Sequence, residues 1–230
     1  MGLDGTWSGS APLQSSLLAL EPESAAAPPV DNADPIEIAF QDGLFPYVIY
    51  AGTSDTKISS GNATTNYGTE QTIDVDGSTD IAGLLKWDVS MIPTNSAVIS
   101  AAIELNVTNT SQNDYEVYAL QQAWDELSAT WEQFAAGQSW FGPGANGGGD
   151  HGDVALGQLA AASNGLQRIE LNEAGVAAVQ AWISDPDANY GVILKDYLAS
   201  DGLDFSTSES ADATLRPKLI VNYAPTAAAI

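Results

Sequence analysis

Cysteine is absent from this chain of 230 residues, and His151 is its only histidine. The lack of cysteine excludes disulfide bonds, thiolate metal sites and cysteine nucleophiles. A Ser-His-Asp triad would have to use His151, which lies in a glycine-rich loop, and the chain has no Gly-x-Ser-x-Gly turn. No P-loop or dinucleotide-binding motif follows a strand pattern. The sequence therefore predicts a protein that is not an enzyme.

Basic residues are also scarce, because 6 Lys and Arg stand against 30 Asp and Glu and leave a formal net charge of −24. Such a surface repels phosphate backbones and anionic bilayers, which argues against nucleic acid and membrane surfaces as partners. We interpret the acidic surface as a means of staying soluble at high ionic strength, in preference to a means of recognising a specific cationic partner. No apolar run approaches the roughly 20 residues of a membrane-spanning helix, so we expect no membrane insertion.

Composition divides the chain into three parts. Residues 1–44 are rich in Ser, Ala, Pro and Glu and predict a linker or extension, with order beginning near Ile36 or Phe45. Residues 45–224 carry short β-branched and aromatic runs between Gly, Asn and Asp clusters, the pattern of one antiparallel all-β domain. Residues 225–230 are expected to be a C-terminal linker.

The predicted strands are short and number about ten. In residues 103–107 apolar and polar side chains alternate, so one face packs inward and the other meets water. One short helix is predicted from Glu173 to Ile183, ended by Asp185-Pro186. Trp87 and Trp182 are expected in the core. The expected strands are residues 47–50, 55–59, 71–75, 82–88, 99–107, 115–120, 167–171, 191–195, 203–206 and 218–223.

An ordered set of motifs runs through these segments: Asp55-Thr56-Lys57-Ile58, the triplets Asn66-Tyr67-Gly68 and Asn189-Tyr190-Gly191, residues 84–90, Trp124 with Thr130-Trp131, residues 201–209, and residues 216–223. With them the chain resembles the DNRLRE domain family. The resemblance implies a jelly-roll-like β-sandwich of the kind found on secreted polysaccharide-degrading enzymes and large surface proteins, and it implies glycan binding. The chain differs at Trp131-Glu132-Gln133, where members often have Trp-Asn. The segment Asn222–Ala227 resembles junctions in bacterial adhesins.

The loop of residues 140–153 is the candidate ligand-binding site. Flat aromatic faces stack on sugar rings, and neighbouring polar groups hydrogen-bond their hydroxyls. Exposed Trp140 and Phe141 would serve the first purpose, and Asn146 and His151 the second, with Trp131 close by. The alternative is that these aromatic side chains close the open end of the sandwich as a minor core.

Calcium is the predicted ion. Asp74, Asp76 and Asp80 alternate around a glycine turn, an arrangement that can present several oxygens to a hard cation. Asp150 with Asp153 offers a second possibility. A solvated hairpin tip explains the first group equally well. Glu209 and Arg216 are expected to form a structural ion pair that closes the last strand.

The leading hypothesis is an extracellular, secreted or cell-surface module of a larger parent protein, which binds neutral polysaccharide and is stabilised by calcium. Neutral polysaccharide is favoured because a polyuronate would meet a surface of its own sign. The rival is a structural spacer or filament subunit without glycan binding, in which Trp140 and Phe141 are buried. A stand-alone hydrolase would need a cleft with paired carboxylates.

Overall fold

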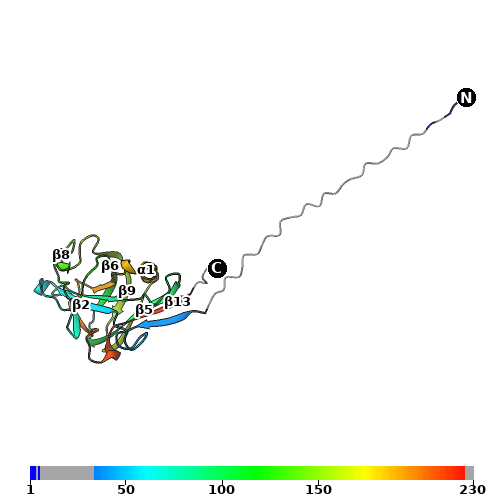
Figure 1. Cartoon of the computed structure of the whole chain (residues 1–230). Helices are drawn as coiled ribbons and strands as arrows, with labels where there is room; N and C mark the ends of the chain where they lie inside the picture. The colour runs from blue at the N-terminus through cyan, green and yellow to red at the C-terminus, as the bar shows by residue number, and fades with distance from the viewer. Residues whose placement is uncertain (4, 6–33, 226–230) are drawn as a thin grey trace. The chain divides into compact units, whose positions relative to one another are not determined.

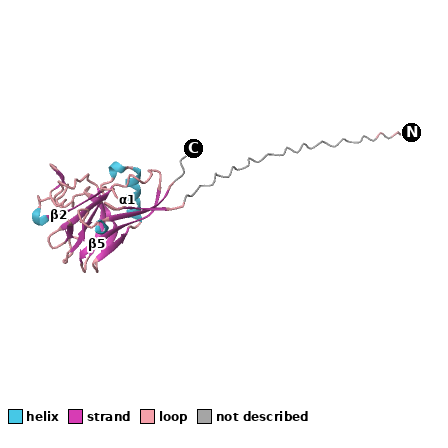
Figure 2. Cartoon of the chain, turned by 60° about the horizontal axis from the view of Figure 1, so that its bottom comes forward, coloured by secondary structure: helices cyan, strands magenta, loops and turns pink. Residues whose placement is uncertain are grey.

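The computed structural model describes residues 1–3, 5 and 34–225, and antiparallel sheets make up most of the regular secondary structure of this part (Figures 1 and 2). The chain divides after Val30, and every sheet belongs to the unit that begins at Asp31. The prediction of an all-β sandwich with one helix is confirmed. Within the described ranges, no helix is both long and apolar enough to cross a bilayer.

One sheet has six strands in the order β1-β13-β5-β12-β3, with β10 also paired to β5. The long strand β5 organises it: β10 pairs with residues 102–107, β13 with residues 97–104, and β12 with Val107 and Asn109. Figure 1 shows β13 beside β5. The strands are β1 (Ile36–Phe40), β3 (Thr72–Val75), β5 (Ala97–Asn109), β10 (Gly165–Glu170), β12 (Leu203–Ser206) and β13 (Lys218–Ala224).

The other large sheet has five strands in the order β2-β4-β11-β6-β9, which leaves β2 at one edge. Its strands are β2 (Thr53–Ser59), β4 (Ile81–Trp87), β6 (Asp114–Leu120), β9 (His151–Ala160) and β11 (Val192–Lys195). A hairpin of β7 (Gln133–Ala135) and β8 (Gln138–Ser139) lies in the connection from β6 to β9. The remaining short elements are the 3-10 turns η1 (Ser60–Asn62), η2 (Pro186–Ala188) and η3 (Ala213–Leu215).

The main core lies between the two large sheets. Alternation along β4 shows how it forms: Leu85 and Trp87 belong to the main core, whereas Ala82 and Leu84 belong to a second cluster on the opposite face. Burial of each large apolar side chain stabilises the fold by about 1.5–3 kcal/mol. We call the face of the five-stranded sheet that carries the second cluster its outer face.

The single described α-helix, α1 (Glu173–Ser184), packs against β5 and β9. Asn172 caps it, because its side-chain oxygen accepts a hydrogen bond from the backbone N–H of Gly175 at 3.1 Å. Trp182 is 4% exposed and Trp87 1%, so both belong to the core as predicted. The helix ends at Ser184, just before Asp185-Pro186, in agreement with the sequence.

Nine of the ten predicted strands are present, with ends shifted by a few residues. The strand expected at residues 47–50 is wrong, because this segment forms a turn in which Tyr50 N donates to Tyr47 O at 2.9 Å. The sequence did not predict β1, β7, β8 and β9. Strand β9 was not predicted because the four glycines and two aspartates of residues 147–153 are typical of a continuous loop.

Strand β1 begins at Ile36, the earlier of the two points at which order was expected to begin, and not at Phe45. It lies inside the predicted linker and pairs with β13 from Ile36↔Tyr223 to Phe40↔Leu219. Phe40 is fully buried, which explains why the segment is ordered. Most of the remaining predicted linker, residues 4 and 6–33, lies outside the described residues, as do residues 226–230 of the C-terminal linker.

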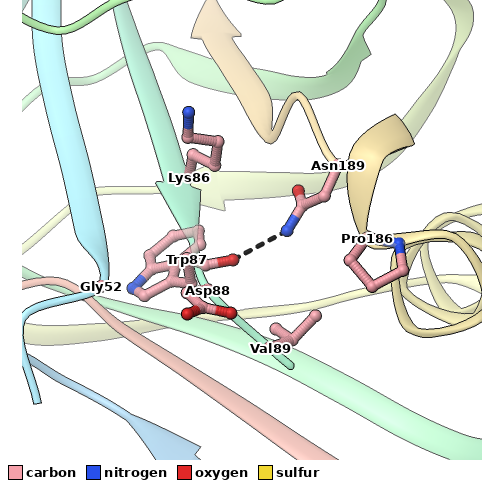
Figure 3. A pocket seen from close by; sticks show the side chains of 7 residues that line it. All are labelled: Gly52, Lys86, Trp87, Asp88, Val89, Pro186 and Asn189. Atoms are coloured by element: carbon pink, nitrogen blue, oxygen red, sulfur yellow. Dashed lines mark hydrogen bonds between the residues drawn. The ribbon is translucent and has the colours of Figure 1, made fainter. Parts of the chain in front are cut away.

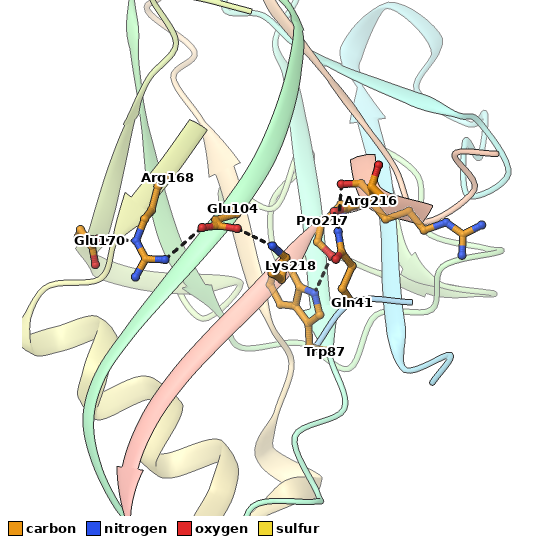
Figure 4. A network of polar contacts seen from close by, with 9 residues as sticks. Gln41, Trp87, Glu104, Arg168, Glu170, Arg216, Pro217 and Lys218 are labelled. Atoms are coloured by element: carbon orange, nitrogen blue, oxygen red, sulfur yellow. Dashed lines mark hydrogen bonds and ion pairs between the residues drawn. The ribbon is translucent and has the colours of Figure 1, made fainter. Parts of the chain in front are cut away.

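The expected ion pair between Glu209 and Arg216 does not form among the described side chains. Arg216 instead donates to the backbone oxygens of Ser210 at 2.9 Å and Asp42 at 3.2 Å. In Figure 4 its guanidinium group points away from the ion pairs formed by Glu104. The guanidinium group serves here as a donor to main-chain carbonyls that no other strand satisfies.

The ion pairs of the six-stranded sheet instead centre on Glu104 of β5. Its carboxylate accepts from Arg168 at 3.1 Å and from Lys218 at 2.7 Å, since both neighbours lie across from it in the sheet (Figure 4). Burial raises the pKa of Glu104, but the hydrogen bonds and charges of Lys218 and Arg168 outweigh it and hold that pKa below its ordinary value.

Candidate functional site

The outer face of the five-stranded sheet is covered in part by the connection between β6 and β9, residues 121–150. Its apolar floor comes from Ile58, Leu84, Leu120 and Ile193 of four neighbouring strands. The connection adds Trp124, Ala129, Trp140 and Ala145 to the same cluster. This second cluster therefore anchors the loop that the sequence singled out.

Trp140 lies inside this cluster, not on the surface. It is 5% exposed, and its indole Nε1 donates to the backbone oxygen of Thr130 at 2.9 Å. Its ring lies 5.6 Å from that of Phe134. Of the two possibilities that the sequence left open for Trp140, the minor core therefore applies, because the indole N–H is satisfied within the loop and the ring gains apolar contacts.

Phe141 has the opposite environment, since 74% of its surface is exposed. Its backbone N–H donates to Asp150 Oδ1 at 2.9 Å, and the backbone N–H groups of Gly142 and Gly147 donate to Asp150 Oδ2 at 3.0 and 2.8 Å. Asp150 itself is fully buried. Its carboxylate therefore fixes the loop that presents Phe141 to solvent.

Lys195, at the end of β11, gathers two of the predicted residues. Its Nζ lies 2.6 Å from Asn146 Oδ1 and 2.8 Å from His151 Nε2. The same ammonium group lies over the rings of Tyr197, at 4.9 Å, and Tyr118, at 5.9 Å. We call these five residues the Lys195 cluster. Its geometry suits contact with a polyhydroxylated ligand, because amide, imidazole, ammonium and aromatic groups adjoin one another.

Partial burial sets the protonation of this cluster. It lowers the pKa of Lys195 to about 8, against a small opposing effect of Asp150. Burial, together with the charge of Lys195, also lowers the pKa of His151. A neutral imidazole agrees with the contacts: Nε2 accepts from Lys195, and Nδ1 donates to Gly152 O at 2.6 Å.

Trp131 joins the cluster through Tyr197, whose ring lies edge-on at 5.5 Å. The hydroxyl of Tyr197 donates to Gly144 O at 2.9 Å. Gly144 has a φ of +74°, and a Cβ there would lie 2.2 Å from the Trp131 ring, so only glycine fits. The structure thus brings Trp131, Asn146 and His151 together and leaves Trp140 beneath them.

Sequence reasoning missed Lys195, Tyr118 and Tyr197. Tyr118 and Lys195 lie on neighbouring antiparallel strands, two register positions apart, and the sequence does not show which strands pair. The one sequence signal for Lys195 was the scarcity of basic residues, 6 against 30 acidic ones. That scarcity does not show which residues a given lysine contacts.

The five carboxylates predicted to bind calcium do not assemble. Asp74 pairs with Lys57, Asp76 Oδ1 accepts from Ser78 N at 2.7 Å, and Asp150 is occupied by backbone amides. Asp80 has a φ of +49° at the turn, and Asp153 is exposed. In the described ranges no three acidic or histidine side chains form a group that could hold a metal ion. These residues therefore do not fit a calcium site.

The two Asn-Tyr-Gly triplets form equivalent corners. In each, the asparagine oxygen accepts from the glycine N–H two residues later, at 3.2 Å for Asn66 and 3.1 Å for Asn189. Asn189 Nδ2 donates to Trp87 O at 2.8 Å on the wall of a pocket of about 200 Å³ (Figure 3). Ligand pockets usually measure about 300–1,000 Å³, so this pocket is small for a ligand site.

A comparison with known families identifies the segment that carries the likeness to carbohydrate-binding proteins. The model of carbohydrate-binding module family 96 matches residues 46–139. The match includes Trp131 and ends before Asn146, His151 and Lys195. It supports a carbohydrate-binding module, and because such modules bind without catalysis, it also supports the prediction of a non-enzymatic domain. A search of curated proteins found no match.

Proposed function

We propose that this domain binds extracellular polysaccharide through the outer face of the five-stranded sheet, at the Lys195 cluster and Phe141. The observation that carries the proposal is the match of residues 46–139 to carbohydrate-binding module family 96. The position of the site is supported by Asn146, His151 and Trp131, which converge at the Lys195 cluster, and by Phe141 of the same connection, whose ring is exposed. Because polysaccharides accumulate outside cells, we also propose that the domain works there as part of a larger protein.

The ligand that we propose is a neutral polysaccharide. A formal charge of −24 opposes the approach of a polyuronate. Lys195 offers little compensation, since Asn146 and His151 already contact its ammonium group. The exposed ring of Phe141 and the partly exposed rings of Trp131 and Tyr118 can stack on sugar faces irrespective of charge.

Affinity electrophoresis through gels that contain a neutral glucan, a neutral mannan or alginate tests the proposal. Retention by a neutral polymer is expected, with a loss of about tenfold in affinity for Phe141→Ala and for Lys195→Met. Leu166→Ala is the matched control, because Leu166 is also exposed but lies on β10 of the six-stranded sheet. Trp140→Ala is unsuitable, since loss of a buried indole perturbs the fold.

Three outcomes would alter the proposal. Retention by alginate alone would replace the neutral ligand by an anionic one. Retention that survives both site variants would move the site away from the Lys195 cluster. Migration unchanged by every polymer, with a folded protein, would favour the structural spacer or filament module, with which the buried position of Trp140 also agrees.

A further inference from the structure

The exposed edge of β2 is covered by carboxylates instead of by another strand. Thr53 N donates to Asp42 Oδ1 at 2.9 Å, and Asp55 N donates to Glu126 Oε1 at 2.7 Å. These contacts satisfy backbone groups that an edge strand would otherwise present to solvent. They also bring two acidic side chains, from the connections β1–β2 and β6–β7, close to a third acid on β2 itself.

That third acid, Asp55, is 1% exposed and only half satisfied. Its Oδ2 accepts from the backbone N–H of Ser208 at 2.8 Å, whereas its buried Oδ1 has no hydrogen-bond partner in the described part of the chain. Glu209, the neighbour of Ser208, has a buried Oε2 that likewise lacks a partner among the described residues. A buried oxygen without a partner is costly, and a charged one more so.

The hydroxyl oxygen of Thr53 lies on the same face of β2 as the Asp55 carboxylate. Thr53 precedes Asp55 by two residues, so both side chains point to one side of β2. Thr53 is 8% exposed, and its Oγ1 is also buried without a partner in the described ranges. Three of the four buried side-chain atoms without partners in the described structure thus belong to Thr53, Asp55 and Glu209.

No described side chain forms an ion pair with this group. Burial raises the pKa of Asp55 well above its ordinary value, and the negative charges of Glu209 and then Glu126 add to the effect. In the described structure Asp55, Glu126 and Glu209 take part in no ion pair. Arg216, the expected partner of Glu209, is held by backbone oxygens. The charge of Lys86 acts on Glu126, but Asp55 and Glu209 form no ion pair within the described ranges.

We propose that a calcium ion binds between β2 and the loop after β12, with Asp55 Oδ1, Glu209 Oε2 and Thr53 Oγ1 as protein ligands. No three acidic or histidine side chains converge in the described residues. The site accordingly uses two carboxylates and a hydroxyl, and water fills the remaining positions. Calcium accepts 6–8 oxygens in irregular arrangements, whereas magnesium requires a near-octahedral set. The ion would join an edge strand to the last loop before β13.

Titration calorimetry and thermal unfolding of chelator-treated protein with CaCl₂ test this site. We expect one ion per chain and a rise in Tm of about 5–10 °C at a hundredfold excess over Kd, with a smaller rise for MgCl₂. Glu209→Gln should weaken calcium binding at least tenfold, and Asp55→Asn should abolish it. Asp76→Asn and Asp153→Asn are matched controls that should bind calcium normally.

A shared proton between Asp55 and Glu209 is the rival explanation. It predicts no heat with CaCl₂, no change in Tm, and a higher Tm for Asp55→Asn in the presence and absence of calcium alike. That result would overturn the proposal, as would calcium binding that survives Glu209→Gln but is lost in Asp76→Asn. If Asp55→Asn does not fold, Glu209→Gln alone decides. None of these measurements depends on a polysaccharide.

Discussion

Asp150 and Asp55 are both buried aspartates, 0% and 1% exposed, yet their surroundings differ. Three backbone N–H groups of one loop surround the carboxylate of Asp150. Asp55 receives one N–H and faces two further acids. A buried carboxylate that is surrounded by backbone amides therefore organises a loop by itself. One that lacks these amides requires a proton or a cation.

The largest expected effect comes from Asp150→Ala. The change leaves the N–H groups of Phe141, Gly142 and Gly147 without their acceptor, so we expect a loss of about 3–5 kcal/mol in the free energy of unfolding. Urea denaturation at constant m measures it. Asp153→Ala, three residues away from Asp150 in the sequence and exposed, should change stability by no more than about 0.5 kcal/mol. Equal effects of the two variants would show that the loop does not depend on Asp150.

Asp55→Asn should raise the free energy of unfolding when calcium is removed, whereas Asp150→Ala lowers it. Because the pKa of Asp55 is raised in the folded state, its protonated form stabilises the protein below the ordinary value of 3.8, and this stability is lost as pH rises through the folded pKa. In chelator at pH 8, the variant should therefore exceed the wild type by about 2 kcal/mol. Denaturation from pH 4 to 8 would contradict this if the two proteins changed in parallel.

Glu104→Gln extends the comparison to an acid that has its counterions. Lys218 and Arg168 hold the pKa of Glu104 below its ordinary 4.5. The ionised carboxylate therefore stabilises the fold above that pH, and this stabilisation is lost as pH falls through the folded pKa. We expect a cost of about 1 kcal/mol at pH 7 that disappears near pH 3. Urea midpoints at the two pH values measure it, and a cost that is unchanged at pH 3 would speak against an electrostatic origin.

Lys195 offers the smallest effect on stability but a direct one on binding. Since its pKa is lowered to about 8, its charge disappears between about pH 7 and pH 9. If the ammonium group contacts the sugar, retention by polysaccharide should weaken over this range in the wild type and not in Lys195→Met. A pH profile of affinity electrophoresis distinguishes the two, and parallel profiles would assign the ligand to other groups.

The sequence predicted what depends on local pattern. Alternation located most strands, and the apolar stretch before Asp185-Pro186 located α1. Strand β1 was missed because only its pairing with β13, some 180 residues later, gives it a place in the sheet. The sequence left the burial of Trp140 open for a related reason: the Thr130 carbonyl and the Phe134 ring that contact it come from a loop whose path no local pattern specifies.

The sites show the same limit. Asn146, His151 and Trp131 were named correctly as neighbours, because all three follow closely in one aromatic and glycine-rich segment. Lys195 was not, since it reaches them only through the pairing of β11 with β6. At the edge of β2, Thr53 and Asp55 lie close to Glu126 and Glu209, which come from two distant segments. The sequence instead assigned calcium to acids that lie close together along the chain.

Binding of neutral polysaccharide by the outer face around Lys195 is tested by affinity electrophoresis of the wild type, Phe141→Ala, Lys195→Met and Leu166→Ala in one neutral-polysaccharide gel. We expect retention of the wild type and Leu166→Ala and about tenfold weaker retention of the other two. Equal retention of all four proteins, or of none while all are folded, would contradict it.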